Sequence, residues 1–202
     1  MPEEQNQSVP DLSTLDFIIY IYDAIDRNTA QVVTQQILTL DKINLLTGRN
    51  TPIQMIINSP GGEMAAAWQI CDVMDFVSTE IHTIALGEVA SAALCIFING
   101  SKGNRVITEK TSIMSHQYSW GTQGQHSNLI AYHTEFLNIQ KRCVDHYKKC
   151  TGLSKKVIET ELLTTHDVFL NAADAIKFKL ADRIESAKPK RTTKVKKQKN
   201  VK

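Results

Sequence analysis

The chain has 202 residues, of which 42% are hydrophobic and 22% are charged. These values exclude a wholly disordered chain and suit one globular domain. No run approaches the roughly 18 apolar residues of a membrane-spanning helix. The acidic start, Met1–Gln5, lacks the apolar core of a secretion signal. The four cysteines show no closely paired framework, so reduced thiols and a cytoplasmic location are expected.

Positive charge is concentrated at the C-terminal end. Eight basic residues fall in positions 188–202, which contain no acid, whereas 15 basic and 21 acidic residues precede them. Such a segment has almost nothing apolar to bury. It could hold an acidic partner through counterion release, but it has no aromatic residue to stack on bases. We therefore interpret residues 187–202 as a disordered, solvated tail and not as a nucleic-acid site.

Apolar periodicity alternates between strand and helix along residues 16–186, which we take as one domain after a polar lead-in of residues 1–15. Gly152 should end the longest helix, and Ser154 is the expected N-cap of the last one. Repeated strand, strand, helix units without a glycine-rich dinucleotide fingerprint predict a spiral α/β fold and not a nucleotide-binding one. The predicted strands are 17–22, 53–57, 81–86, 105–107 and 112–114, and the predicted helices are 28–46, 63–77, 90–99, 128–150 and 155–162.

A glycine-rich turn joins the second predicted strand to the second predicted helix. It reads Asn58-Ser59-Pro60-Gly61-Gly62. Paired glycines allow backbone conformations and close approaches that side chains forbid. Such a turn can aim N–H groups at a developing oxyanion, although Pro-Gly-Gly alone also marks ordinary turns.

A hydroxyl and an imidazole follow in two further motifs, Ala90-Ser91-Ala92 and Ser115-His116-Gln117. A serine hydroxyl is a poor nucleophile at neutral pH and needs a base, which in turn needs an orienting acid. The residues alone do not distinguish His116 from the other histidines, or Asp167 from other acids. The competitors are His82, His126, His133, His146 and His166, and Asp145, Asp174 and Asp182.

Together these motifs resemble the proteolytic subunit of the Clp ATP-dependent protease (ClpP), within the wider crotonase-like fold, from Asp16 to Ile184. The resemblance implies a ClpP/crotonase-like spiral in a single α/β domain. The motifs that carry it are Ile57–Gly62, Gly87–Ala93, Met114–Gln117 and His166–Ala172.

Carried over by position, the resemblance implies a catalytic triad. Ser91 would be the nucleophile, His116 the base and Asp167 the acid that completes the set. The N–H groups of Gly62 and Ala92 would form the oxyanion hole.

Three departures from the family pattern concern local geometry. Ala92 stands where the family usually has methionine, which leaves its N–H in place and could widen the neighbouring pocket. Tyr118 replaces a usual proline. The spacing from His116 to Asp167 is longer than usual, so the loops between them are expected to differ.

The segment Gly121–Gln125 resembles the family's glycine-rich handle strand. In relatives that strand lines the substrate groove and interlocks two rings. A strand with few side chains suits pairing with an extended peptide, so Gly121 and Gly124 are expected to bind substrate. Gly61 of the glycine-rich turn is the third expected substrate-binding glycine. A loop is the alternative interpretation.

A metal site is not expected, although Cys143, His146 and Cys150 share a helix face. The two cysteines lie about 10.5 Å apart along the helix axis, and Zn–S bonds of about 2.3 Å cannot easily bridge that separation. The face is expected to pack in the core or at a subunit interface.

The resemblance implies a serine endopeptidase that needs no cofactor of its own, because ATP is used only by a partner, a Clp-type AAA+ unfoldase. Its substrates would be unfolded proteins or peptides, and it would assemble as a homo-oligomer of stacked heptameric rings or with related subunits. Because residues 1–15 show no helical period, we expect an axial entrance that is poorly gated or completed by another subunit. The alternatives are a catalytically inactive ring subunit and a crotonase-like acyl-CoA enzyme.

Overall fold

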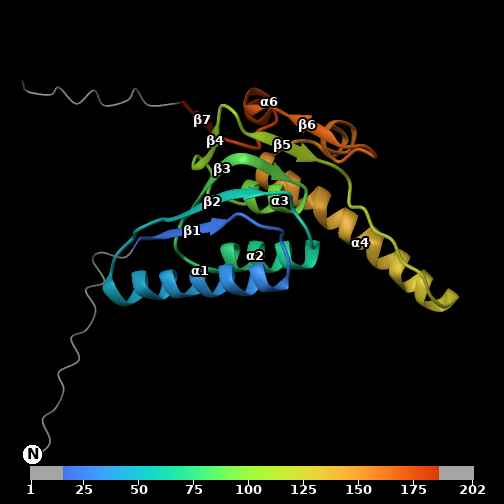
Figure 1. Ribbon diagram of the computed structural model, residues 1–202, viewed down its shortest axis with the longest axis horizontal. Helices are drawn as coiled ribbons and strands as arrows, with labels where there is room; N and C mark the ends of the chain where they lie inside the picture. Colours follow the sequence, from blue (N-terminus) through green and yellow to red (C-terminus); the bar gives the residue numbers. More distant parts are fainter. Residues whose placement is uncertain (1–15, 187–202) are drawn as a thin grey trace, which may run out of the picture.

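A mostly parallel sheet is the centre of the chain, which a computed structural model describes over residues 16–186. The predicted lead-in and the predicted basic tail lie outside the described residues. The strands are β1 (Ile18–Ile21), β2 (Ile53–Ser59), β3 (Ile81–Ala90), β4 (Arg105–Thr108), β5 (Ser112–Ser115), β6 (Val168–Leu170) and β7 (Arg183–Glu185). They follow the order β1-β2-β3-β4-β7, and β5 pairs with both β3 and β6 (Figure 1).

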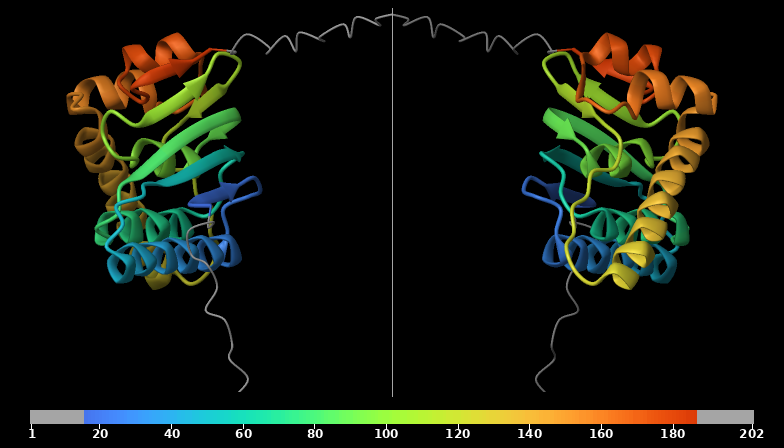
Figure 2. Two further views of the ribbon diagram at one scale, coloured as in Figure 1. Left: turned by 90° about the vertical axis from the view of Figure 1, so that its left-hand side faces the viewer. Right: turned by 90° about the vertical axis from the view of Figure 1, so that its right-hand side faces the viewer.

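Helices pack around this sheet in two groups. The elements are α1 (Arg27–Thr47), α2 (Met64–Phe76), α3 (Ala92–Ile98), α4 (His126–Thr151), α5 (Lys155–Val157), the π-helical turn η2 (Ile158–Leu162) and α6 (Ala172–Lys177). Figures 1 and 2 show α1 and α2 side by side along one side of the sheet, while η2 and α6 lie with β6 at its opposite end. Within residues 16–186, no helix is both long and apolar enough to cross a membrane.

The local rules explain most of these elements. In β2 the side chains of Ile53, Met55 and Ile57 alternate into the core and are fully buried. Helix α1 begins where the Asp26 carboxylate accepts the N–H of Thr29 at 2.7 Å and ends at left-handed Gly48. The predicted single α/β domain is confirmed.

Strand β3 changes partners along its length, and this change positions the site. Its first half, Thr83–Ala85, pairs with β4, and its second half, Glu88–Ala90, pairs with β5. The change occurs at Gly87, whose φ of 63° favours glycine. The Asn58 side-chain oxygen accepts the N–H of Glu88 at 3.0 Å and so holds the bend. As a result, β3 runs on to Ala90, beyond the predicted end at Leu86.

Helix α4 forms an arm that extends beyond the rest of the body (Figure 1). Its buried residues all lie in the C-terminal half, from Cys143 to Thr151. The helix begins two residues before the predicted position 128 and ends at Gly152 as predicted. Ser154 caps α5 through a 3.3 Å bond from the N–H of Val157, as predicted, although the turn that follows is π-helical.

The predicted strand at Gly121–Gln125 is wrong for the single chain. Residues 116–125 contain no strand, because a strand needs a neighbouring backbone and the backbone of residues 118–124 has no such partner within the described part of the chain. Aromatic side chains hold this linker against α4 instead. The rings of Tyr118 and Phe136 lie 5.5 Å apart, and those of Trp120 and Tyr132 lie 5.8 Å apart.

The C-terminal elements are held by an ion pair between the buried Arg105 on β4 and the partly exposed Asp182 before β7. Arg105 Nη2 lies 2.6 Å from Asp182 Oδ1, and the side chains are only 4% and 20% exposed. Burial alone would raise the pKa of Asp182, but hydrogen bonds from Arg105 outweigh it and hold that pKa below its ordinary value.

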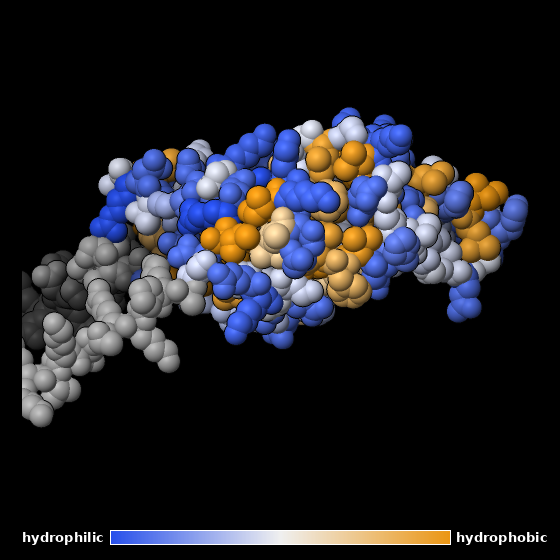
Figure 3. All heavy atoms as spheres, turned by 90° about the horizontal axis from the view of Figure 1, so that it is seen from above, coloured by the Kyte–Doolittle hydropathy of each residue, from blue (hydrophilic) through white to orange (hydrophobic). Residues whose placement is uncertain are grey.

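The surface seen from above is mostly hydrophilic, and its apolar side chains gather in separate patches (Figure 3).

Candidate active site

Ser91 occupies a sharp turn between β3 and α3. Its φ of 52° and ψ of −120° lie in a region that costs a non-glycine residue on the order of 1–3 kcal/mol. The turn is held because the N–H of Ser91 donates to Met114 O at 2.9 Å. A serine presented on such a turn resembles a nucleophile elbow, which exposes the hydroxyl at the end of a strand.

His116 follows β5, the strand to which the Ser91 turn is bonded. Its Nε2 lies 2.7 Å from Ser91 Oγ, which is hydrogen-bonding distance for a hydroxyl and its base. The adjacent backbone is fixed by the N–H of Gln117, which donates to Thr164 O at 3.0 Å. The two predicted residues therefore meet because β5 pairs with the second half of β3.

Asp167 faces His116 through the antiparallel pairing of β5 with β6. Ser115 is opposite Val168 in this register, so the next residues outward on the two strands are His116 and Asp167. His116 Nδ1 and Asp167 Oδ1 lie 3.9 Å apart, and the Asp167 side chain is 56% exposed. This distance is too long for a hydrogen bond, so Asp167 is adjacent to His116 but not in hydrogen-bonding contact with it.

The three aspartates that compete with Asp167 for the role of orienting acid either pair with other residues or lie elsewhere in the fold. Asp182 pairs with Arg105, and Asp174 forms a capping box with Asn171 at the start of α6. Asp145 is exposed on α4. Asp167 is therefore the acid that the fold brings to His116.

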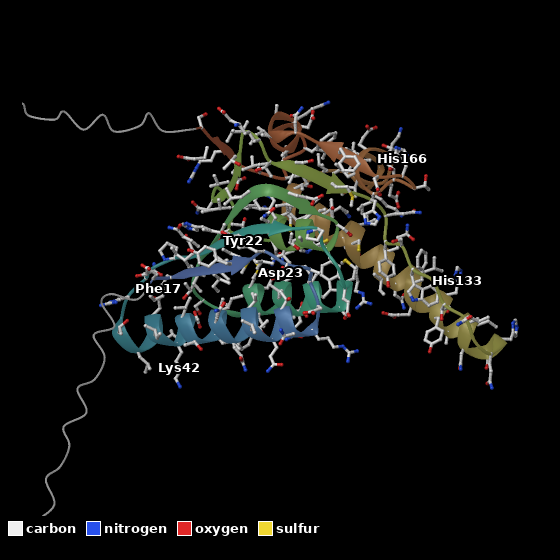
Figure 4. The ribbon with its side chains drawn as sticks, viewed as in Figure 1. Phe17, Tyr22, Asp23, Lys42, His133 and His166 are labelled. Atoms are coloured by element: carbon white, nitrogen blue, oxygen red, sulfur yellow. The ribbon has the colours of Figure 1, made fainter. Side chains whose placement is uncertain are left out.

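The other histidines lie in different settings. His82 Nε2 contacts Glu80 at 3.1 Å, and His146 Nε2 contacts Cys95 O at 2.9 Å. His133 lies out on α4 and His166 close to β6 (Figure 4). His126 is exposed at the first position of α4. Among the histidines, the one that contacts Ser91 Oγ is His116.

Gly61 and Gly62 form a backbone cradle beside Ser91. A Cβ on Gly61 would lie 2.6 Å from Ala90 O, and one on Gly62 would lie 2.2 Å from Ile25 O, so neither position admits a side chain. Gly62 forms a parallel bridge with Ile25, in which Ile25 bonds to Gly61 and Glu63. In this pattern the N–H of Gly62 points away from Ile25.

Ala92 supplies the second candidate N–H group for the predicted oxyanion hole, beside that of Gly62. As the first residue of α3, its N–H has no carbonyl partner inside the helix. The ideal Cβ of Gly61 lies 3.0 Å from Ala92 N, so the cradle and the start of α3 are in contact.

Two cavities meet at this site. A small pocket of about 70 Å³ is lined by Ser91, His116 and the thiol-bearing residues Cys95 and Cys143. A larger cleft of about 960 Å³ runs between α2 and α4. The two share four lining residues, Gly62, Met64, Tyr118 and Ser119, so the cleft opens directly onto the pocket of Ser91.

The linker contributes differently from the prediction. Of its residues 118–124, Tyr118 and Ser119 line the two cavities, whereas Gly121 and Gly124 line neither of them. Both glycines are exposed, and an added Cβ would meet nothing within 4 Å. Their role in binding a peptide stays a prediction.

The cysteines pack in the interior, as predicted for Cys143, His146 and Cys150. All four thiols are free and buried, and burial raises the pKa values of Cys143 and Cys150 to about 11. Burial also lowers the pKa of His146. No cluster of His, Cys, Asp or Glu side chains that could hold a metal ion occurs within residues 16–186.

The sequence did not reveal the positive φ of Ser91, nor that Glu63 before α2 and Trp68 and Asp72 within α2 line the cleft. The α2 residues gave no signal of the cleft, since helical periodicity does not say which exposed face borders a cleft.

A comparison with protein-family models matches residues 3–188 to the family described as Clp protease. The match spans most of the chain, and the fold places the serine, histidine and aspartate of its motifs side by side. The parallel sheet with its surrounding helices is consistent with the ClpP/crotonase-like fold. The chain belongs to the Clp protease family.

Proposed function

We propose that the chain is a serine endopeptidase, the proteolytic subunit of a Clp-type ATP-dependent protease. The observation that carries this proposal is the 2.7 Å contact between Ser91 Oγ and His116 Nε2 at the strained turn. Strain of this kind is retained where function requires it.

In the acylation step, Ser91 Oγ attacks the carbonyl carbon of the scissile peptide bond while His116 Nε2 takes the hydroxyl proton. The carbonyl oxygen gains negative charge and accepts hydrogen bonds from the N–H groups of Gly62 and Ala92. The C–N bond then breaks, and the protonated His116 gives its proton to the leaving amine. The product is an ester between the substrate's acyl group and Ser91.

In the deacylation step, a water molecule attacks this ester and passes its proton to His116. Collapse of the tetrahedral species releases the carboxylic acid and returns the proton to Ser91 Oγ. Asp167 orients His116 and stabilises its cationic form. Because the contact to Asp167 is 3.9 Å in the single chain, this link must shorten in the active state.

No cofactor enters these steps, and ATP belongs to a separate Clp-type AAA+ unfoldase that delivers unfolded protein. The family membership supports assembly into stacked rings that enclose the sites. Four free thiols support a cytoplasmic location.

Incubating the purified chain with an unfolded protein, and counting the new amino termini by mass spectrometry, tests this function. Cleavage that Ser91→Ala abolishes is expected. Cleavage that persists in that variant, or none by the assembled particle with its unfoldase, would contradict the proposal.

A catalytically inactive ring subunit is the second candidate. It is favoured by the exposed Asp167 and its open contact to His116. It predicts normal assembly with no cleavage under any condition.

A further inference from the structure

The larger cleft continues the nucleophile's pocket and can hold several residues of an extended chain. One wall is formed by Glu63 and by α2 as far as Val73, and the other is the middle of α4, from Glu135 to Arg142. Tyr118 and Ser119 of the linker line both cavities. A peptide with its scissile carbonyl at Ser91 would therefore extend into this cleft.

The cleft has an apolar lining beside its polar groups. The apolar and aromatic members are Ile25, Met64, Trp68, Val73, Tyr118 and Ile139. Long aliphatic stems pack on such surfaces while a terminal charge stays near the polar edge. Aromatic faces also attract cations.

The charges of the cleft are predominantly negative. Its lining has four carboxylates, on Asp26, Glu63, Asp72 and Glu135, against the single guanidinium of Arg142. That guanidinium is already paired with Glu135. Hydrogen bonds from Thr29 hold the pKa of Asp26 below its ordinary value, so it remains ionised at neutral pH.

Glu63 and Asp72 differ from the other two acids because their carboxylates are unpaired. Neither forms a side-chain hydrogen bond or ion pair with any residue in the described range, although both line the cleft. Glu63 also directly follows Gly62 of the cradle. A cationic side chain near the scissile bond would find these two carboxylates free.

We infer that this cleft selects substrates with lysine or arginine close to the scissile bond. The inference rests on the proposed function and adds a specificity to it. The stem of the basic side chain packs on the Trp68 and Tyr118 side of the cleft, and its charge meets Glu63 and Asp72. Because both carboxylates are exposed to water, the selection is modest, about threefold to tenfold in kcat/KM.

The test uses fluorogenic peptides that differ only in lysine, norleucine or glutamate at each position near the cleaved bond. The expected order of kcat/KM is lysine, then norleucine, then glutamate at one or more positions. The preference should shrink between about 0.05 M and about 0.5 M salt, because exposed charges are screened.

The decisive variant is Glu63→Gln combined with Asp72→Asn. In this variant the kcat/KM of the lysine peptide should be close to that of the glutamate peptide, so that their ratio is about one. The matched control is Glu109→Gln combined with Glu161→Gln, which removes the same charge from exposed positions outside the cleft. The control should keep the wild-type ratio. Equal turnover of the lysine and glutamate peptides by the wild type, or a ratio that survives in the cleft variant, would overturn the inference.

A binding measurement separates this inference from the proposed function. Fluorescence anisotropy with Ser91→Ala should show tighter binding of the lysine peptide than of the glutamate peptide. If the wild type cleaves no peptide, the proposed function fails, but this difference in binding still supports the preference of the cleft for basic side chains. Equal binding of the two peptides would overturn the cleft's role even in an active peptidase.

Discussion

Ser91 Oγ and His116 Nε2 lie 2.7 Å apart although they stand on separate elements. The distance follows from one backbone bond, in which the N–H of Ser91 donates to Met114 O at 2.9 Å. That bond exists because β3 leaves β4 at Gly87 and pairs with β5. The contact between Ser91 and His116 is thus a consequence of how β3 changes its pairing partner.

The first prediction concerns the nucleophile and its base. Ser91→Ala should lower peptide hydrolysis by about 10⁴-fold or more, because the acyl-enzyme can no longer form. His116→Ala should be similarly damaging. Circular dichroism and native mass should be unchanged, since a single hydroxyl is removed at Ser91. Comparable turnover by purified Ser91→Ala would contradict the triad.

The second prediction concerns Asp167. Asp167→Asn should lower kcat by about 10-fold to 10³-fold, because the amide no longer stabilises the cationic imidazole. The effect should be smaller than that of Ser91→Ala, since the carboxylate is exposed and not in hydrogen-bonding contact in the single chain. Asp145→Asn is the matched control on an exposed site and should retain full activity. Wild-type kinetics for Asp167→Asn would point to a different orienting acid.

The third prediction concerns crowding at the cradle. Gly62→Val should lower kcat/KM by about 10²-fold or more, because its Cβ would lie 2.2 Å from Ile25 O and must displace the backbone. Gly103→Ala is the control, since Gly103 has a φ of 87° but open space around it. The control should lose about 1 kcal/mol of stability and little activity. Full activity of Gly62→Val at normal assembly would show that the cradle does not hold the oxyanion.

The fourth prediction concerns acid stability. The folded-state pKa of Asp182 lies below its ordinary value of 3.8, so its ionised form stabilises the fold above that pH. This contribution falls as the pH drops through the folded-state pKa. At neutral pH Asp182→Asn should cost about 3 kcal/mol, because Arg105 remains buried without its partner charge.

Urea unfolding from about pH 7 down to about pH 3 measures this contribution. The difference between wild type and Asp182→Asn should be largest at neutral pH and should shrink below about pH 4. A difference that stays constant across this range would show that the ion pair does not set the acid sensitivity.

Much of the fold was predictable because its signals are local. The alternation of Ile53, Met55 and Ile57 marks β2, and Gly48 and Gly152 mark the ends of α1 and α4. The three-residue strands β6 and β7 were missed, although predictions of the same length at 105–107 and 112–114 were confirmed, because so short a segment carries too little periodic pattern to decide either way. The prediction of a strand at Gly121–Gln125 was wrong for the single chain because a strand needs a partner backbone, which the described residues do not supply to this segment.

The candidate site was predictable in its residues but not in its geometry. The family motifs pointed to Ser91, His116 and Asp167, and the fold brings all three together. Neither the positive φ of Ser91 nor the 3.9 Å separation of Asp167 from His116 could be predicted from the motifs. These features depend on strand register and on the loop between His116 and Asp167, which residue types alone do not fix.

Labelling with a fluorophosphonate tests the central claim most directly, because the reagent forms a phosphonyl ester with an activated serine and releases fluoride. Peptide mapping by mass spectrometry should place the label on Ser91, with Ser91→Ala unlabelled and His116→Ala labelled far more slowly. No labelling of the assembled wild-type particle, or labelling at another residue with Ser91 free, would contradict the assignment of Ser91 as the nucleophile.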